Sequence, residues 1–261
     1  QFVRMAERQP PDQRGSARSE GRDYRWDLGL GFHGAVKLGH EGWAEGAKRV
    51  SAQLEVLNIQ PHKAEPELTF ARVGPGVLDF GRYTKGYPVP WMVWKDGNDS
   101  RQGAGEVVTV LVNACASAGF NADAYLRKGV MVCALVDLLE GLGYRAELKV
   151  AMATEGLRGK VIKTSILLKR PGDALNMDRV AFAIAHPAAF RRLGFGVWEH
   201  SPQPFRQALN IPGNYGHVYQ VREEGAIVIP GGDLRVADTI AGQMEWVREV
   251  LLTQGIIWKS D

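Results

Sequence analysis

The sequence is poor in cysteine and in long apolar runs, and each shortage excludes a class of protein. Two cysteines among 261 residues cannot form a disulfide framework, so a reducing, intracellular compartment is expected. The apolar run at residues 107–112 falls far short of the ~20 residues that a membrane-spanning helix needs, so no membrane association is expected. No charged start followed by a long apolar core and a cleavage site is visible, so no signal peptide is predicted.

Excess charge and the common motifs of enzymes are also missing. A net charge of +3 with a pI near 8.9 is too weak to imply nucleic acid by itself. The sequence has no Gly-x-x-x-x-Gly-Lys-Ser/Thr segment, and the single glycine at Gly119 does not make a dinucleotide fingerprint. His-Glu-x-x-His, Cys-x-x-Cys and Gly-x-Ser-x-Gly are absent as well, so no cofactor is expected.

What the sequence does contain is enough apolar material for a substantial core. Hydrophobic residues make up 45% of the chain, which excludes a disordered protein. The length fits one large α/β domain, or one domain with a small appendage. We expect a flexible basic arm at residues 1–25, a helical and loop extension packed on the core at 26–105, and an α/β core at 106–261.

The N-terminal arm is polar and rich in Arg, Gln and Pro. Such a segment cannot bury enough apolar surface to fold alone, which predicts a flexible or draped arm. The alternative is an arm that binds a partner subunit or a phosphate backbone through Arg14, Arg18 and Arg22.

The extension changes character along its length. Residues 32–57 are predicted to be helical, since apolar residues recur at helical spacing. Glycine and proline then multiply over residues 74–90, which predicts an irregular connection, with apolar residues 89–94 packing on the main domain.

Strands and helices alternate in the second half. The predicted strands are residues 107–112, 144–151, 160–168, 190–197 and 226–229, and the predicted helices follow Asn121, run over 173–187 and run over 236–252. This order predicts a doubly wound, mostly parallel sheet with helices on both faces. The lysines that flank the strand at 160–168 are typical of an edge strand.

The loop after the first core strand is the leading candidate site, because an α/β fold places its chemistry at the carboxyl ends of strands. This loop holds Asn113, Cys115 and Ser117. Two further loops are expected at the same rim, and they add three candidates: Glu199, His200 and Asp233.

The scaffold resembles a von Willebrand A-like (Rossmann-like) α/β core with an irregular N-terminal extension. That resemblance implies a divalent ion held in the first loop by an Asp and two Ser. Here Asn113 offers a neutral amide, Cys115 offers sulfur, and Ser117 alone matches. The metal site is therefore interpreted as lost, with Asp233 and Glu199 as the only residues able to rescue it.

A second resemblance covers most of residues 30–257. The segments Phe32-His-Gly, residues 42–46, 110–117, 127–130, 134–140, 143–147 and 178–183 look like a family of uncharacterised proteins encoded by bacteriophages and mobile elements. The resemblance implies a viral or plasmid origin, but no activity to carry over.

Four basic residues near predicted helices are candidates for a binding patch. They are Arg127, Lys128, Arg191 and Arg192. Solvated surface charge is the expectation for all four.

The leading hypothesis is a non-enzymatic structural or protein–protein interaction protein, acting in a larger assembly in the host cytoplasm or a virion. Protein partners or self-association are expected. The first alternative is a nucleic-acid-associated protein that uses the arginine arm with Lys160 and Lys163. The second is a thiol hydrolase with Cys115 as nucleophile and His200 or His217 as base.

Overall fold

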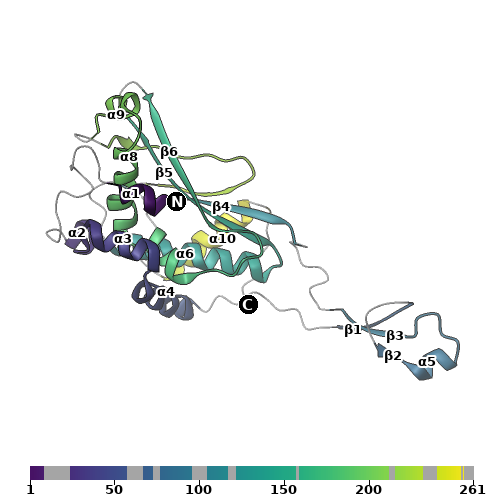
Figure 1. Ribbon diagram of the computed structural model, residues 1–261. Helices are drawn as coiled ribbons and strands as arrows, with labels where there is room; N and C mark the ends of the chain where they lie inside the picture. The colour runs from purple at the N-terminus through teal and green to yellow at the C-terminus, as the bar shows by residue number, and fades with distance from the viewer. Residues whose placement is uncertain are drawn as a thin grey trace.

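The computed structural model describes residues 1–8, 24–57, 67–72, 77–95, 105–116, 122–156, 159–211, 215–231, 240–253 and 255. They form a mixed α/β fold with a five-stranded and a three-stranded sheet (Figure 1). The strands are β1 (Glu67–Ala71), β2 (Val77–Leu78), β3 (Trp91–Lys95), β4 (Val107–Asn113), β5 (Arg145–Glu155), β6 (Val161–Lys169), β7 (His217–Val218) and β8 (Ile227–Ile229). The helices are α1 (Phe2–Ala6), α2 (Tyr24–Asp27), α3 (Gly31–Glu41), α4 (Ala44–Leu57), α5 (Phe80–Thr84), α6 (Ala122–Gly141), α7 (Met177–Val180), the π-helices η2 (Ala181–Ala185) and η3 (Ala189–Gly194), α8 (Phe195–Glu199), α9 (Gln203–Leu209) and α10 (Ile240–Thr253). No described helix is long and apolar enough to cross a bilayer.

The five-stranded sheet has parallel strands at its centre. Its order is β6-β5-β4-β8, and β7 pairs with the last residues of β5, beyond the end of β4. β4 runs parallel to both β5 and β8. The carboxyl ends of these three strands therefore meet at one edge of the sheet.

The expectation of a mostly parallel sheet is wrong, because β5 pairs antiparallel with β6 and with β7. The segment between β5 and β6 covers only residues 156–160. A parallel crossover needs about a dozen residues or more, so this short connection makes a hairpin instead. The predicted edge position of the strand at 160–168 is confirmed, since β6 ends the strand order.

Residues 190–197 are helical, so the strand predicted there is wrong. η3 and α8 run through this segment, and their large apolar side chains are buried, among them Leu193, Phe195 and Trp198. A short apolar run has the same composition in a buried helix and in a buried strand, so periodicity did not separate the two.

One face of the five-stranded sheet is covered by helices. Val110, Val112 and Leu148 belong to one large core with residues of α6, η2, η3 and α8. The opposite face holds a small cluster of Leu111, Ala151, Ala153 and Val221, where Val221 lies in the segment between β7 and β8. Within the described ranges this second face is covered by that segment and not by a helix.

The helix predicted over residues 32–57 is divided into α3 and α4 at Gly42. Gly42 has φ of +89°, a conformation that L side chains rarely adopt. A Cβ atom there would also lie 2.6 Å from the Cβ of Asp178 in α7, so glycine allows the end of α3 to approach α7.

The beginning of the N-terminal arm is docked on the core. Phe2, Val3 and Met5 of α1 pack against it, and Ala6 is fully buried. Arg14, Arg18 and Arg22 lie outside the described residues.

The region predicted to be irregular contains the three-stranded antiparallel sheet, in the order β1-β3-β2, with α5 after β2. We call β1, β2, α5 and β3 (residues 67–95) the projecting sheet, because Figure 1 shows it set apart from the five-stranded sheet. Apolar residues 89–94 lie in or just before β3, so they form part of this second sheet, and the described side chains of Trp91, Met92 and Val93 are not among those that pack against the main core.

Candidate functional site

The predicted strand-end loop is tightly packed. Asn113 is fully buried, its Nδ2 donates to the carbonyl of Tyr219 at 2.9 Å, and its Oδ1 accepts from the N–H of Cys115 at 3.1 Å. Gly231, just beyond β8, lies so close that a Cβ atom there would be 2.6 Å from the Asn113 side chain. Both the nitrogen and the oxygen of the Asn113 amide are therefore hydrogen-bonded within the chain.

Cys115 is also fully buried, which works against a nucleophilic role. Its Sγ accepts a hydrogen bond from the N–H of Ala153 in β5 at 3.1 Å. Burial raises the pKa of the Cys115 thiol to about 12, although the Ala153 hydrogen bond and the nearby Lys128 charge oppose the shift. The thiolate is the reactive form, so this thiol is inert at neutral pH.

Lys128 of α6 is the third member of this cluster. It is buried, and its ammonium donates to the carbonyl oxygens of Asn113 and, at 3.1 Å, of Pro230. The side chain thus ties the ends of β4 and β8 together. Burial lowers the pKa of Lys128 to about 7, partly opposed by Cys115.

The expectation that Lys128 is a solvated surface charge is wrong. Most residues of α6 are buried, including Tyr125 three positions before Lys128 and Met131 three positions after it. Residues three apart share one face of a helix, so these large neighbours at that spacing were the sequence signal that Lys128 is buried.

Two of the predicted loop residues cannot be placed. Ser117 and Asp233 lie outside the described residues. Among the residues that are described, no three His, Cys, Asp or Glu side chains gather in a way that could hold a metal ion.

Glu199 and His200 lie on and just after helix α8, and Glu199 contacts Tyr215, whose carbonyl accepts from Thr154 near the carboxyl end of β5. Glu199 is buried and accepts from the hydroxyl of Tyr215, whose ring stacks on Phe195 at a centroid distance of 3.9 Å. His200 Nδ1 donates to the carbonyl of Gly196 at 2.6 Å, within its own helix. Glu199 thus links α8 to the chain before β7, whereas His200 bonds back onto α8.

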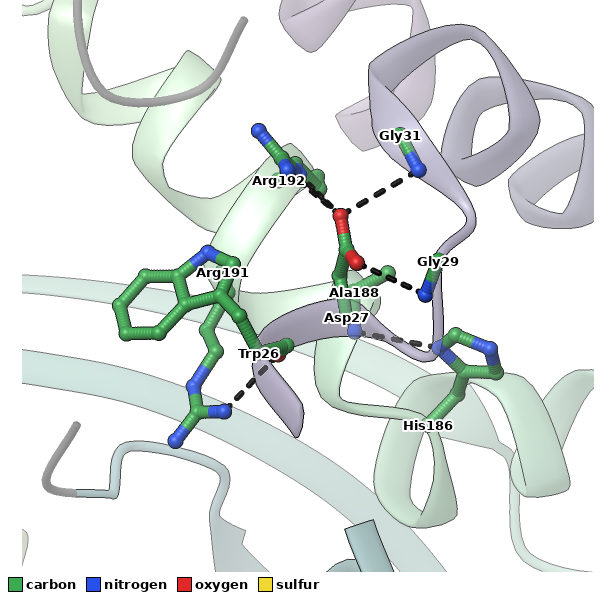
Figure 2. A network of polar contacts seen from close by, with 8 residues as sticks. All are labelled: Trp26, Asp27, Gly29, Gly31, His186, Ala188, Arg191 and Arg192. Atoms are coloured by element: carbon green, nitrogen blue, oxygen red, sulfur yellow. Dashed lines mark hydrogen bonds and ion pairs between the residues drawn. The ribbon is translucent and has the colours of Figure 1, made fainter. Parts of the chain in front are cut away.

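A buried ion pair that the sequence did not reveal joins α2 to η3 (Figure 2). Arg192 donates from Nε and Nη2 to Oδ2 of Asp27, at 2.8 and 2.5 Å, and all of these side chains are fully buried. The N–H groups of Gly29 and Gly31 also donate to the Asp27 carboxylate, at 2.9 and 3.3 Å. Its oxygens are thus satisfied by four donors, as a buried charge requires.

Arg191 lies beside this pair and is buried as well, so surface charge is also the wrong interpretation for both arginines. Its Nη1 donates to the carbonyl of Trp26 at 2.8 Å, and its guanidinium lies 4.3 Å from the centre of the Trp26 ring. The partner of Arg192 is 165 residues away in sequence, so no local pattern could have found it.

Two of the predicted nucleic-acid contacts are exposed. Lys160 precedes β6, and Lys163 lies within it. The three arginines of the same prediction lie outside the described residues.

The projecting sheet carries exposed aromatic and apolar side chains. The strand register places Phe70, Val77 and Met92 on one face and Leu78, Trp91 and Val93 on the other. Of the side chains whose burial is described here, only Pro90 is buried. Its most exposed large hydrophobic side chains, among those described, are Phe80 at 69%, Val77 at 66%, Tyr83 at 59% and Tyr87 at 51%.

Arg82 of α5 orders part of this surface. Its guanidinium lies 3.9 Å from the centre of the Phe70 ring and 4.9 Å from that of Tyr87. Asp79 starts the helix by accepting from the N–H of Arg82 at 3.0 Å. Aromatic rings and arginine are the residues enriched in the energetic centres of protein interfaces.

Comparison with known proteins gives one family. The model of a domain of unknown function, DUF7192, matches residues 1–257. No curated protein and no solved structure matches the chain.

Proposed function

The chain belongs to the family of DUF7192, a domain of unknown function, and from its structure we propose a non-enzymatic interaction protein that acts within a larger assembly. The observation that carries the proposal is the projecting sheet, which has apolar side chains on both faces, none of them buried among the strand residues whose side chains are described. An antiparallel sheet exposed to water normally keeps one polar face. A sheet that is apolar on both faces is typical of one that other protein layers cover.

Stability supports the same role. The projecting sheet spans residues 67–95, and chains below about 40 residues rarely bury enough surface to be stable unaided. Contact with a protein partner would supply the missing burial, at roughly 25 cal/mol per Å² of apolar surface removed from water.

The residues at the carboxyl ends of β4 and β8 support a binding protein more than an enzyme. Asn113, Cys115 and Lys128 all have internal partners, and the Cys115 thiol has a raised pKa. These features count against the thiol hydrolase. Membership of a phage or mobile element, a location in the host cytoplasm or a virion, and a von Willebrand A-like ancestry are part of the proposal and rest on sequence resemblance.

A photo-crosslinking experiment tests the proposal. A photoreactive phenylalanine replaces Phe80 on the projecting sheet or, as a control, Phe205 of α9, which is 52% exposed. Crosslinking in native cells should yield one defined protein adduct from position 80 and none from position 205. Equal adducts from both positions, or none from position 80, would contradict the proposal.

The nucleic-acid alternative keeps one specific observation, the exposure of Lys160 and Lys163. It predicts that the chain binds a single-stranded oligonucleotide, and that this binding weakens steeply as the salt concentration rises. Bound lysines release counterions from the phosphates, and this release contributes less free energy at high salt. Absent or salt-insensitive binding would remove it.

A further inference from the structure

The outer edge of β6 is a second surface without a partner among the described residues. β6 ends the strand order of the five-stranded sheet, and its pairing there is with β5. Such an edge presents a row of N–H and C=O groups that another chain can pair with.

The hairpin geometry shows which backbone groups face outward. Gly156 N–H donates to the carbonyl of Lys160 at 2.8 Å, so residue 160 turns its backbone toward β5. Directions alternate along an antiparallel strand, so residues 162, 164 and 166 do the same. Val161, Lys163, Ser165 and Leu167 therefore point their N–H and C=O groups outward.

The other side of β5 confirms this alternation. The carbonyls of Ala151 and Ala153 accept from the N–H groups of Ala114 and Tyr219, on the side away from β6. The odd-numbered residues of β5 thus face β4 and β7, which leaves its even-numbered residues to bond with β6.

The side chains of β6 divide into two kinds. Ile162, Ile166 and Leu168 pack, half-buried, against the main core on the helix-covered face. Lys163 and Ser165 are exposed on the opposite face. A strand added at this edge would extend an apolar layer on one face and meet a lysine on the other.

Charge decides between the possible occupants. Residues 159–170 contain Lys160, Lys163, Lys169 and Arg170 and no acidic residue. Lys169 is buried and paired with Glu140 of α6 at 2.5 Å, while the other three are exposed. A second β6 would bring like charges together, which disfavours pairing between copies. An acidic strand would be attracted.

We propose that the edge of β6 binds an extended protein segment of alternating acidic and apolar residues, as an added strand of the sheet. Backbone hydrogen bonds to Val161, Lys163 and Ser165 supply affinity. Its apolar residues continue the layer of Ile162 and Ile166, and its acids face Lys163. This surface is separate from the projecting sheet, so either proposal can fail without the other.

The probe is a fluorescein-labelled peptide of five Glu-Val repeats, and its binding is followed by fluorescence anisotropy. A peptide of five Lys-Val repeats should bind at least about tenfold more weakly, as should the acidic peptide to Lys163→Glu. Ser165→Pro removes an outward N–H and keeps the β5 pairing, since proline is tolerated on an edge. We expect it to weaken binding about tenfold, and Ser165→Ala to bind as the natural chain does.

Three results would overturn the proposal. The first is equal binding of the acidic peptide to Ser165→Pro, which would mean simple charge attraction. The second is tighter binding of a ten-nucleotide oligothymidine, unaffected by Ser165→Pro, which would make the edge a nucleic-acid surface. The third is slow amide hydrogen exchange at residues 161, 163 and 165 in the free chain, which would mean that the edge is already covered.

Discussion

Burial determines what individual side chains at the strand ends can do. Cys115 and Lys128 are reactive types of residue, yet both are enclosed and hydrogen-bonded to backbone groups. Their pKa values move in the directions that burial dictates, upward for the thiol and downward for the ammonium. Both changes favour the neutral form, which suits a packed core.

Alkylation of Cys115 tests its inertness. Iodoacetamide at pH 7 should modify the folded chain very slowly, because burial raises the thiol pKa to about 12 and blocks access. Cys133 is the internal control, since it is buried on α6 with its pKa raised to about 12 as well. Both cysteines should react fully after denaturation. Rapid modification of Cys115 alone, read by peptide mass spectrometry, would revive the thiol hydrolase.

His186 should make stability depend on pH. Burial lowers its pKa to about 4, opposed by the Asp27 charge, and its Nδ1 accepts from the N–H of Ala188 at 3.1 Å. Because the folded pKa lies below the unfolded value of about 6.5, the unfolded chain binds the proton first. The free energy of unfolding should therefore fall as pH drops from about 6.5 to 4, by on the order of 3 kcal/mol for this group.

The variant His186→Asn isolates this effect, since an amide oxygen can still accept from Ala188 and does not titrate in this range. Urea unfolding measured between pH 4 and 7 should show a shallower decline for the variant. Equal declines for both proteins would show that other groups set the acid sensitivity.

Individual residues also mark the limit of what sequence could reveal. The strand predicted at residues 107–112 is β4, so Asn113 and Cys115 do lie at a strand end, while their role as a site stays a prediction. Lys128, Arg191 and Arg192 were assigned to the surface because charged side chains are rarely buried without a partner. Their partners are backbone carbonyls and a carboxylate from distant segments, which only the fold brings near.

At the level of elements, the length of a connection determined the strand directions better than the residue composition did. The short segment between β5 and β6 required a hairpin, and this turned an expected parallel sheet into a mixed one. The helix α6 and the strands β4, β5 and β8 were predicted from periodicity and capping. The helical segment of η3 and α8 was not predicted, because its continuous apolar run has no periodicity that separates a buried helix from a buried strand.

The ion pair between α2 and η3 should be cooperative. Removing one charge, in Asp27→Asn or Arg192→Met, leaves the other buried without its partner and should cost about 3–5 kcal/mol of unfolding free energy. The double variant should lose clearly less than the sum of the two single losses. Additive losses in urea unfolding would mean that the two charges do not stabilise each other.

In the molecule as a whole, the buried apolar side chains gather around the five-stranded sheet, and the surfaces without a described partner lie at its margins. The helix-covered sheet accounts for nearly all the buried apolar side chains among the described residues. The projecting sheet and the edge of β6 lack such cover. The sequence predicted an α/β core with an extension, but not the projecting sheet, since β2 has only two residues and glycine and proline surround it.

Hydrogen–deuterium exchange of residues 67–95 tests the central claim most directly. The measurement compares the purified chain with the same chain isolated in its native assembly by a tag. Backbone amides of β1 and β3 should exchange rapidly in the free chain, because little is buried around them, and far more slowly in the assembly. Amides of β4 in the core serve as the control and should be slow in both. Identical exchange of residues 67–95 in both samples would contradict the proposal that this sheet binds a partner.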